Sequence, residues 1–407
     1  MQAQVNCAAS QTPYTGQAPF PDRLDGTCAE VPHDFSGGFF PEDFHASEHN
    51  IDLHSWLLFV ALNWPADEAA CVADKARGFA TPGPRETPLW LTWRKDTEIM
   101  ADPKAAPKPW CQSSRELLLP AVNQATSNGI LVDRNGLFVR YMVVVNKEEY
   151  DYIVRQSLWT HRGQLAFSEE HPVEFPWGDA SRIGAIEVKA AWKVIGPGDD
   201  AAHFLTRRAV VYNGVEPRTV TVGLVGLHIA HKTRRQPGWI WSTFEQVDNL
   251  TGSFHHDCKD CSSELPAREL DSRGRPLSKP TPIEAVANET EHREINDRFR
   301  KLLAGTVWSN YRLVATQWVV ERLKEKPGLP QSTPCTALNP VLETFAARPG
   351  PEPFPPSCIR CHEGAHDSTG SRADFSWLLR RAVDAPKTPD FKPNTAGWQR
   401  PCDERPR

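Results

Sequence analysis

The apolar residues of the segment 50–76 recur with the period of an α-helix. They follow the i, i+3, i+4, i+7, i+8 spacing at Leu53, Trp56, Leu57, Val60 and Ala61. Pro65 marks the expected end, because proline cannot continue a helix. Residues 1–49 are rich in proline and glycine and show little periodicity, so we expect an extended arm that lies on the body.

The middle of the chain carries β patterns. Asn135-Gly136 lies between two apolar, β-branched runs in residues 129–146, which is typical of a tight hairpin. Further strands are expected at residues 184–195, 203–212 and 218–231, and residues 147–156 read as a helix. The fold class that follows is α+β, with a mostly antiparallel β core in the middle and flanking helices.

The helical pattern returns from about residue 281. Residues 281–305 carry Pro282 in the expected first turn and Gly305 past the expected end. A proline-dense stretch and a further short helix follow. The predicted organisation is an arm (1–49), a mixed α/β body (50–280), a helical C-terminal segment (281–385) and a polar tail (386–407).

Charge and hydropathy bear on which kinds of binding partner the chain is suited to. The chain has 407 residues and a formal net charge of -5, which favours neither nucleic acid nor an anionic membrane. No apolar run is long enough to span a bilayer, and no nucleotide-binding glycine motif is present. The N-terminus lacks a secretion signal. We interpret Met1 as a start placed ahead of a mature N-terminus, although an ordinary cytosolic protein would look the same at this position.

Ten cysteines indicate an oxidising compartment. Two of them belong to the C-x-x-C-H motif of Cys358, Cys361 and His362, and the remaining eight could form up to four disulfides. Local candidates are Cys7 with Cys28 and Cys258 with Cys261; several free buried thiols are the alternative. The pair Cys258 and Cys261 has a serine where a haem-binding histidine would stand, which leaves a disulfide loop or a zinc site with His255 or His256.

C-x-x-C-H has the spacing needed to hold haem c covalently. Two thiols on one helical turn can add to the two vinyl groups, and the next residue, His362, then becomes an axial ligand of the iron. The other interpretation is a redox or zinc C-x-x-C with an incidental histidine. With haem, the C-terminal segment of the predicted fold becomes a helical, haem-bearing segment.

The distal side of the haem iron is either open or weakly filled, or it takes a ligand from upstream, since no methionine follows His362. His228 and His231 lie in or just past an apolar strand, where the two would face opposite ways. Each could be a buried core histidine, and His228 is the first candidate for a distal ligand or acid/base group. His54 is a weaker candidate for the distal side of the haem. His366 would lie at the protein surface or contact a haem propionate, because it follows His362 on the same helix face.

Three other groups could line a pocket over the haem. The clusters are Trp239, Trp241, Glu245, Asp248 and Asn249; Glu187, Lys189 and Trp192; and, for the propionates, Arg312 and Arg372. Each of the first two is equally explained by a packed aromatic layer with a satisfied ion pair.

With these residues in view, the chain resembles large bacterial mono-haem proteins of the cytochrome c family. The resemblance spans about residues 50–380 and rests on segments such as SWLLFVALNWP, VGLVGLHIAHKT, WIWSTFEQVDN and the late SCIRCH. It implies an exported protein with Cys358, Cys361 and His362 as the haem residues, and it implies no substrate.

The expected protein is therefore a periplasmic mono-haem c-type cytochrome. The body of residues 50–280 exceeds what electron carriage needs, which favours an oxidoreductase with a substrate pocket between body and haem. The alternatives are an electron-transfer cytochrome with a six-coordinate His/His haem and a binding protein with a structural haem. Its partner would be a redox protein or a small-molecule substrate.

Overall fold

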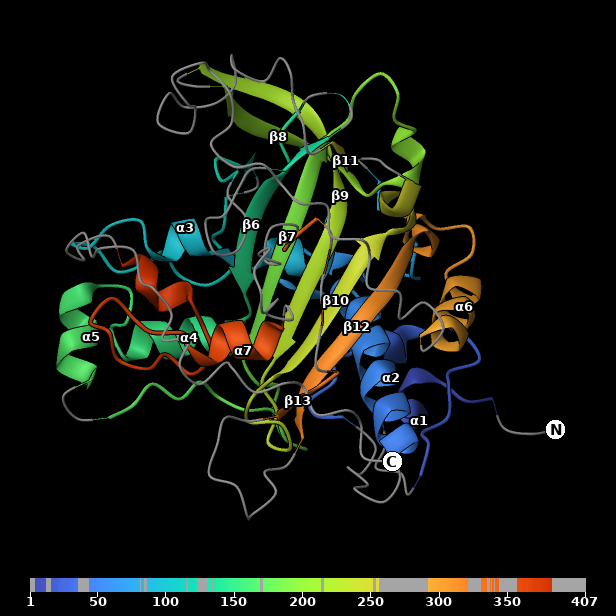
Figure 1. Ribbon diagram of the computed structural model, residues 1–407, viewed down its shortest axis with the longest axis horizontal. Helices are drawn as coiled ribbons and strands as arrows, with labels where there is room; N and C mark the ends of the chain where they lie inside the picture. Colours follow the sequence, from blue (N-terminus) through green and yellow to red (C-terminus); the bar gives the residue numbers. More distant parts are fainter. Residues whose placement is uncertain are drawn as a thin grey trace, which may run out of the picture.

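The protein is built around one large twisted sheet with helices on both sides (Figure 1). The computed structural model describes residues 4–11, 16–35, 44–80, 82–83, 86–114, 116–122, 131–133, 135, 137–168, 171–213, 216–251, 254–255, 292–320, 331–334, 337, 339, 341–343 and 357–382. Among these residues, no helix combines the length and apolar character needed to cross a bilayer.

The sheet confirms the predicted antiparallel β core. Its described strands run in the order β13 (Gln331–Thr333), β12 (Tyr311–Val320), β10 (Ile240–Gln246), β9 (Glu216–His231), β7 (Ile186–Val194), β6 (Arg140–Val145) and β3 (Arg94–Lys95). Every neighbouring pair in this row is antiparallel. Strand β8 (Thr206–Asn213) pairs with β9, and β4 (Leu117–Leu118) lies parallel to β8.

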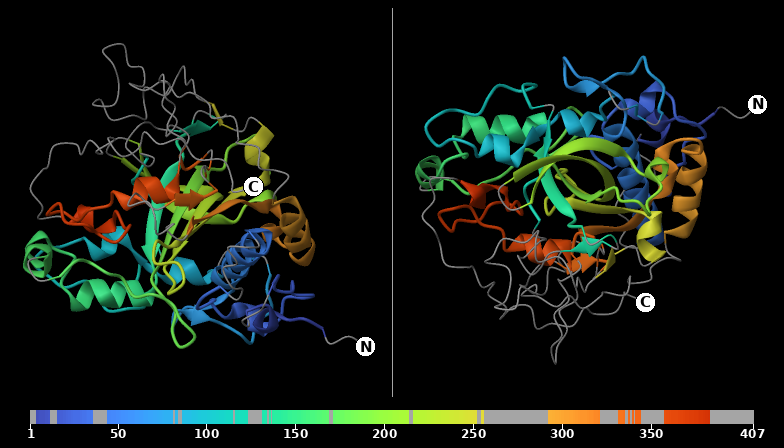
Figure 2. Two further views of the ribbon diagram at one scale, coloured as in Figure 1. Left: turned by 60° about the horizontal axis from the view of Figure 1, so that its bottom comes forward. Right: turned by 90° about the horizontal axis from the view of Figure 1, so that it is seen from above.

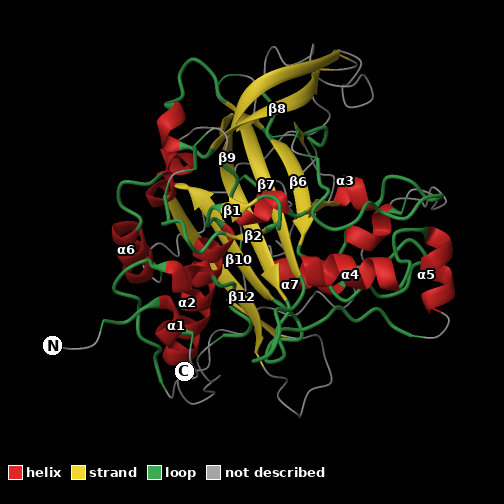
Figure 3. Ribbon diagram, turned by 180° about the vertical axis from the view of Figure 1, so that it is seen from behind, coloured by secondary structure: helices red, strands yellow, loops and turns green. Residues whose placement is uncertain are grey.

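Helix α2 (Phe44–Leu62) covers one face of this sheet, and α7 (Cys358–Glu363) lies on the other. Figure 2 shows the two helices on opposite sides when the sheet is seen from above, and Figure 3 shows α2 in front in the view from behind. Ser55 of α2 hydrogen-bonds to both Ser242 and Thr316 (2.8 Å each), which fixes the helix against the sheet.

Helix α2 begins at Phe44, six positions before the predicted segment, and it ends before Pro65 as expected. All residues from Asn50 to Leu62 are buried, because the helix is enclosed by the sheet, the N-terminal residues and α6 (Arg293–Leu302). Trp56 stacks on Phe299 of α6 with ring centroids 4.9 Å apart. The N-terminal arm is not wholly extended, since α1 (Cys7–Ser10) and a 3-10 turn at Gly26–Ala29 lie within it.

Strand β12 lies inside the segment 281–385 that was expected to be helical. Buried residues along β12 include Tyr311, Leu313, Ala315 and Trp318, and the strand pairs with β10 over Tyr311–Gln317. The sheet therefore includes residues on both sides of the predicted boundary at 281. The expected helix before Gly305 is present as α6 (Arg293–Leu302). Residues 281–291 of the expected segment lie outside the described part of the chain.

The remaining described elements are short or flank the sheet. The helix predicted at residues 147–156 is present as α4 (Lys147–Arg155). Two backbone hydrogen bonds, from Asp133 N to Leu137 O and from Val139 N to Leu131 O (2.9 Å each), confirm a hairpin around Asn135. These elements are β1 (Ala66–Asp67), β2 (Val72–Ala73), α3 (Asp96–Ile99), β5 (Val132–Asp133), α4 (Lys147–Arg155), α5 (His161–Ser168), β11 (Phe254–His255) and 3-10 turns at Leu89–Thr92, Ala201–His203, Val247–Thr251, Val307–Asn310 and Leu378–Arg381.

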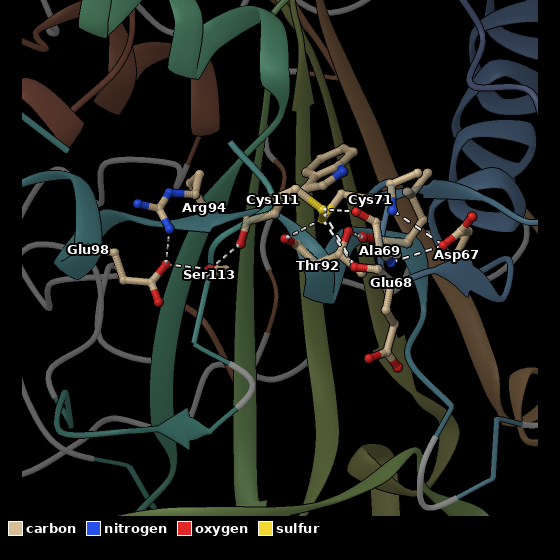
Figure 4. Close-up of a disulfide and its surroundings, with 12 residues drawn as sticks. Asp67, Glu68, Ala69, Cys71, Thr92, Arg94, Glu98, Cys111 and Ser113 are labelled. Carbon is tan, nitrogen blue, oxygen red and sulfur yellow. Dashed lines mark hydrogen bonds and ion pairs between the residues drawn. A yellow bond between two sulfur atoms is a disulfide. The ribbon is translucent and has the colours of Figure 1, made fainter. Parts of the chain in front are cut away.

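Two disulfides are formed. The predicted pair Cys7–Cys28 is confirmed, and Cys71–Cys111 joins positions 40 residues apart. Figure 4 shows the second bond beside Asp67, whose carboxylate accepts a hydrogen bond from Ala69 N (2.9 Å) in the turn before Cys71. The expected pair Cys258 and Cys261, and also Cys335 and Cys402, lie outside the described residues.

Candidate functional site

Helix α7 brings the C-x-x-C-H side chains together. The Ser357 hydroxyl oxygen accepts a hydrogen bond from Arg360 N (3.2 Å) and caps the first turn. Residues three and four positions apart share one face of a helix, so Cys358, Cys361 and His362 project from one side. Neither cysteine is in a disulfide.

Gln317 of β12 anchors this helix to the sheet. Its side-chain oxygen accepts hydrogen bonds from Ile359 N (2.9 Å) and from the Ser357 hydroxyl (3.1 Å). Its side-chain nitrogen donates to the Pro334 carbonyl (2.7 Å). Ile359 is fully buried between these contacts. The start of α7 is therefore held at the same place by polar and apolar contacts.

One ring nitrogen of His362 is held in a hydrogen bond, and the other is available to bind a metal. Its Nδ1 lies 2.7 Å from the Phe375 carbonyl oxygen, which can only accept, so Nδ1 carries the proton. The Nε2 lone pair is then the one free to bind a metal. Burial lowers the pKa of His362 to about 4, which keeps the ring neutral near pH 7. The Trp241 ring packs against it at 4.2 Å between centroids.

The two thiols are protonated and shielded. Burial raises the pKa of both, and the nearby Glu343 carboxylate raises it further, to about 11 for Cys361. Thiolates are the nucleophilic and metal-binding form of cysteine, so these side chains do not resemble a reactive pair.

Three sheet residues face the motif from β7, β9 and β10. Lys189 lies directly opposite His228, and His228 lies opposite Thr243, so the three side chains share one face of the sheet. His228 Nε2 is hydrogen-bonded to the Glu343 carboxylate. Burial lowers the pKa of Lys189, while the charge of the Glu343 carboxylate acts against it. The motif and this sheet face are thus close neighbours.

The segment containing Glu343 crosses the same face. The Tyr141 hydroxyl donates to the Val341 carbonyl (3.0 Å), and the Asn339 side chain donates to the Thr243 hydroxyl (3.0 Å). Gly226 makes this approach possible, because a Cβ there would come within 2.5 Å of a Val341 methyl. Burial raises the pKa of Glu343, but His228 and Lys189 outweigh it, and the net shift is downward.

His231 and His54 belong to the opposite face. Their Nδ1 and Nε2 atoms are 3.1 Å apart, and the rings are stacked with centroids at 5.3 Å. Burial lowers the pKa of His54 to about 3 and that of His231 well below the ordinary value, so both are neutral core residues. His366 packs edge-on against Trp377 at 4.9 Å, just past α7.

The remaining candidates divide. Trp241 touches the motif and Glu187 lies on the same face as Lys189, whereas Glu245 and Arg312 form an ion pair with each other (2.7 Å). Trp192 packs against Trp90. The other residues of these clusters make contacts of several kinds. Asp248 pairs with His203, Asn249 donates a hydrogen bond to the Val225 carbonyl, the Trp239 ring packs on Phe175, and Arg372 forms a backbone β-bridge with His366.

Sequence reasoning missed Glu343, Gln317 and the Phe375 carbonyl. Gln317 reaches the motif helix from 40 residues upstream, and the Phe375 carbonyl reaches His362 from 13 residues downstream. A backbone carbonyl leaves no trace in residue type. A polar glutamine in the apolar strand YRLVATQWVV was the one available signal.

The donor set fits haem iron better than zinc. Among the described residues, no group of three or more His, Cys, Asp or Glu side chains is arranged to hold a metal ion. Structural zinc needs four such ligands. Covalent haem needs two free thiols and one imidazole with an available nitrogen, and α7 supplies these.

Comparison with known proteins yields no relative, because no family model, curated protein or solved structure matches the chain. A function must therefore be argued from the residues themselves.

Proposed function

We propose that the chain is an exported mono-haem c-type cytochrome. The observation that carries this is His362, which donates Nδ1–H to the Phe375 carbonyl and keeps Nε2 available beside two unpaired thiols. Cys358 and Cys361 would hold haem c through thioether bonds, with His362 as axial ligand. The haem would supply one-electron redox chemistry at its iron.

The residues around His362 prepare it for this role. The Phe375 carbonyl fixes the ring and its tautomer and makes the free nitrogen more basic. Trp241 packs on one side of the ring, and Gln317 holds the helix that carries it. The two thiols, His362 and Lys189 are half-buried.

Within this class we favour an oxidoreductase. His228 Nε2 is engaged by Glu343, as expected of an acid/base pair rather than of a ready iron ligand. Lys189 adds a cationic donor on the same face. The alternative is an electron-transfer protein with a six-coordinate His/His haem. The position of His228 on the face that meets α7 favours this alternative. Ligation by His228 would require its hydrogen bond to Glu343 to break, or Nδ1 rather than Nε2 to bind the iron.

The two disulfides support export into an oxidising compartment, which is where haem of this type is attached and which would be the periplasm of a bacterium. The partner would be a redox protein or a small-molecule substrate.

The test is an absorption spectrum after export together with the haem-attachment machinery. Wild-type protein should carry haem that survives denaturation, and His362→Ala should lose its axial ligation while the matched His366→Ala does not. A high-spin ferric spectrum with rapid carbon monoxide binding supports the oxidoreductase, and a low-spin spectrum indifferent to carbon monoxide supports electron transfer. Wild-type protein without covalent haem would end the proposal.

A further inference from the structure

Four ionisable side chains gather behind the loop that holds His362. Glu149 comes from α4, Glu187 from β7, Lys232 from the residue after β9 and Asp374 from the loop after α7. Glu149 is fully buried, and neither of its carboxylate oxygens has a hydrogen-bond partner among the described residues; the charge of Glu187 acts on it. The Ser376 hydroxyl donates to Glu187, and Lys232 is paired with Asp374. None of these four residues takes part in holding the haem proposed above.

The loop itself is strained and firmly held. Asp374 and Phe375 have φ angles of 49° and 68°, a region that favours glycine. Such backbone persists when its surroundings fix it. Here Phe175 N donates to Asp374 (2.7 Å) on one side of Phe375, and Ser376 binds Glu187 on the other. These contacts direct the Phe375 carbonyl at His362 Nδ1.

The pKa values of the two glutamates are shifted unequally. Burial raises the pKa of both; the Glu187 charge raises that of Glu149 further, whereas the hydrogen bond from Ser376 lowers that of Glu187. A proton that the pair takes up therefore binds Glu149. Asp374 adds a third carboxyl, Lys232 is the one cation paired with it among the described residues, and the exposed Glu174 faces Asp374 from the surface.

We propose that Glu149 and Glu187 form a proton-binding pair that is coupled to the haem through Ser376 and the Phe375 carbonyl. The inference rests on the proposed function. When a redox partner protein delivers one electron, the pair takes up one proton from solvent, and both leave on reoxidation. Loss of the proton leaves negative charge beside Ser376 and strengthens the His362 hydrogen bond, and both effects favour the oxidised state.

The test is the reduction potential of the haem-loaded protein, measured over pH values well above the pKa of about 6 to which burial raises Asp374, so that this carboxyl stays ionised. The potential of wild type should fall as pH rises, by up to 59 mV per tenfold change in proton concentration for a one-electron couple. Glu149→Gln keeps the shape and the hydrogen-bond donor but not the exchangeable proton, so its potential should be independent of pH. Glu174→Gln removes a surface charge near the same loop and should keep the slope.

A second readout separates coupling from structure. The reduced-minus-oxidised infrared spectrum should contain a carboxylic acid band in wild type that Glu149→Gln lacks. Ser376→Ala keeps both carboxyls but removes the link, so the slope and the difference band should fall together. This variant also serves if Glu149→Gln does not fold. A haem-bearing wild type with a pH-independent potential overturns this inference alone, whereas the absence of covalent haem overturns the proposed function with it.

Discussion

His228 and His231 lie three positions apart on β9 and therefore belong to opposite faces of the sheet. The period of two in a strand predicts this separation from sequence, and the structure confirms it. Their environments then differ completely. His231 joins His54 in the core against α2, and His228 meets Glu343 on the face that α7 covers.

Replacing His228 by Ala should leave the covalent haem and the spin state of the ferric protein unchanged, because the hydrogen bond to Glu343 already occupies its Nε2. If His228 is an acid/base group, turnover with a peroxide or oxygen substrate should fall by roughly 100- to 10,000-fold. The ferric spectrum and steady-state rates measure the two effects. A change from low spin to high spin in the variant would instead identify His228 as an iron ligand.

Asp374 should make the stability of the protein depend on pH. Burial raises its pKa to about 6 in the folded state, above the ordinary value of 3.8. The unfolded chain therefore ionises first, so the stabilising contribution is complete below pH 3.8 and is lost as pH rises towards 6. The loss is about 3 kcal/mol for two pH units.

Chemical denaturation across this range should show Asp374→Asn with a flatter pH profile than wild type. Asp151→Asn provides the matched control, since Asp151 is half-buried and its partner Lys147 lies at the surface. An identical slope in Asp374→Asn and wild type would contradict the assignment of this titration.

At the scale of elements, strand periodicity and turn signals predicted β7, β8, β9, the hairpin around Asn135 and helix α4. Strand β12 was missed inside a segment expected to be helical, because its pairing with β10 is a long-range contact that local pattern does not carry. The motif residues were likewise evident from their spacing. The groups around them were not, since Gln317 lies on a strand placed by long-range pairing, and Glu343 and the Phe375 carbonyl lie in segments whose course local pattern does not carry.

Gly226 sets how closely the segment at Val341 can approach the sheet. Gly226→Ala should destabilise the protein by about 1–3 kcal/mol, because the added methyl would overlap Val341. It should also displace Glu343 from His228. Denaturant unfolding gives the loss in stability, and the double variant with Val341→Ala should recover part of it. An equal loss with and without Val341→Ala would show that the strain lies elsewhere.

At the scale of the whole molecule, two disulfides fasten the periphery to the sheet-centred core. Cys7–Cys28 closes the N-terminal residues beside α2, and Cys71–Cys111 joins segments on the face that α2 covers. Their pairing could not be deduced from sequence in full, because eight cysteines allow many connectivities.

Replacing Cys71 and Cys111 by Ser should lower the free energy of unfolding by about 2–4 kcal/mol, mainly by freeing the unfolded chain. The loss should slightly exceed that for Cys7 and Cys28, whose separation is 21 rather than 40 residues. Denaturation of the two double variants under non-reducing conditions measures both values. A larger loss from the shorter loop would point to contacts rather than chain entropy.

The docking of α7 against the sheet also implies an order of events in biogenesis. Cys358 and Cys361 are half-buried on the side of α7 that meets Lys189 and Glu343, and Gln317 closes the start of the helix. An enzyme that joins a haem to these thiols needs both of them within reach. On the proposed function, we therefore expect ligation to precede closure of the C-terminal segment, so that the cofactor is enclosed by folding and does not enter a finished protein.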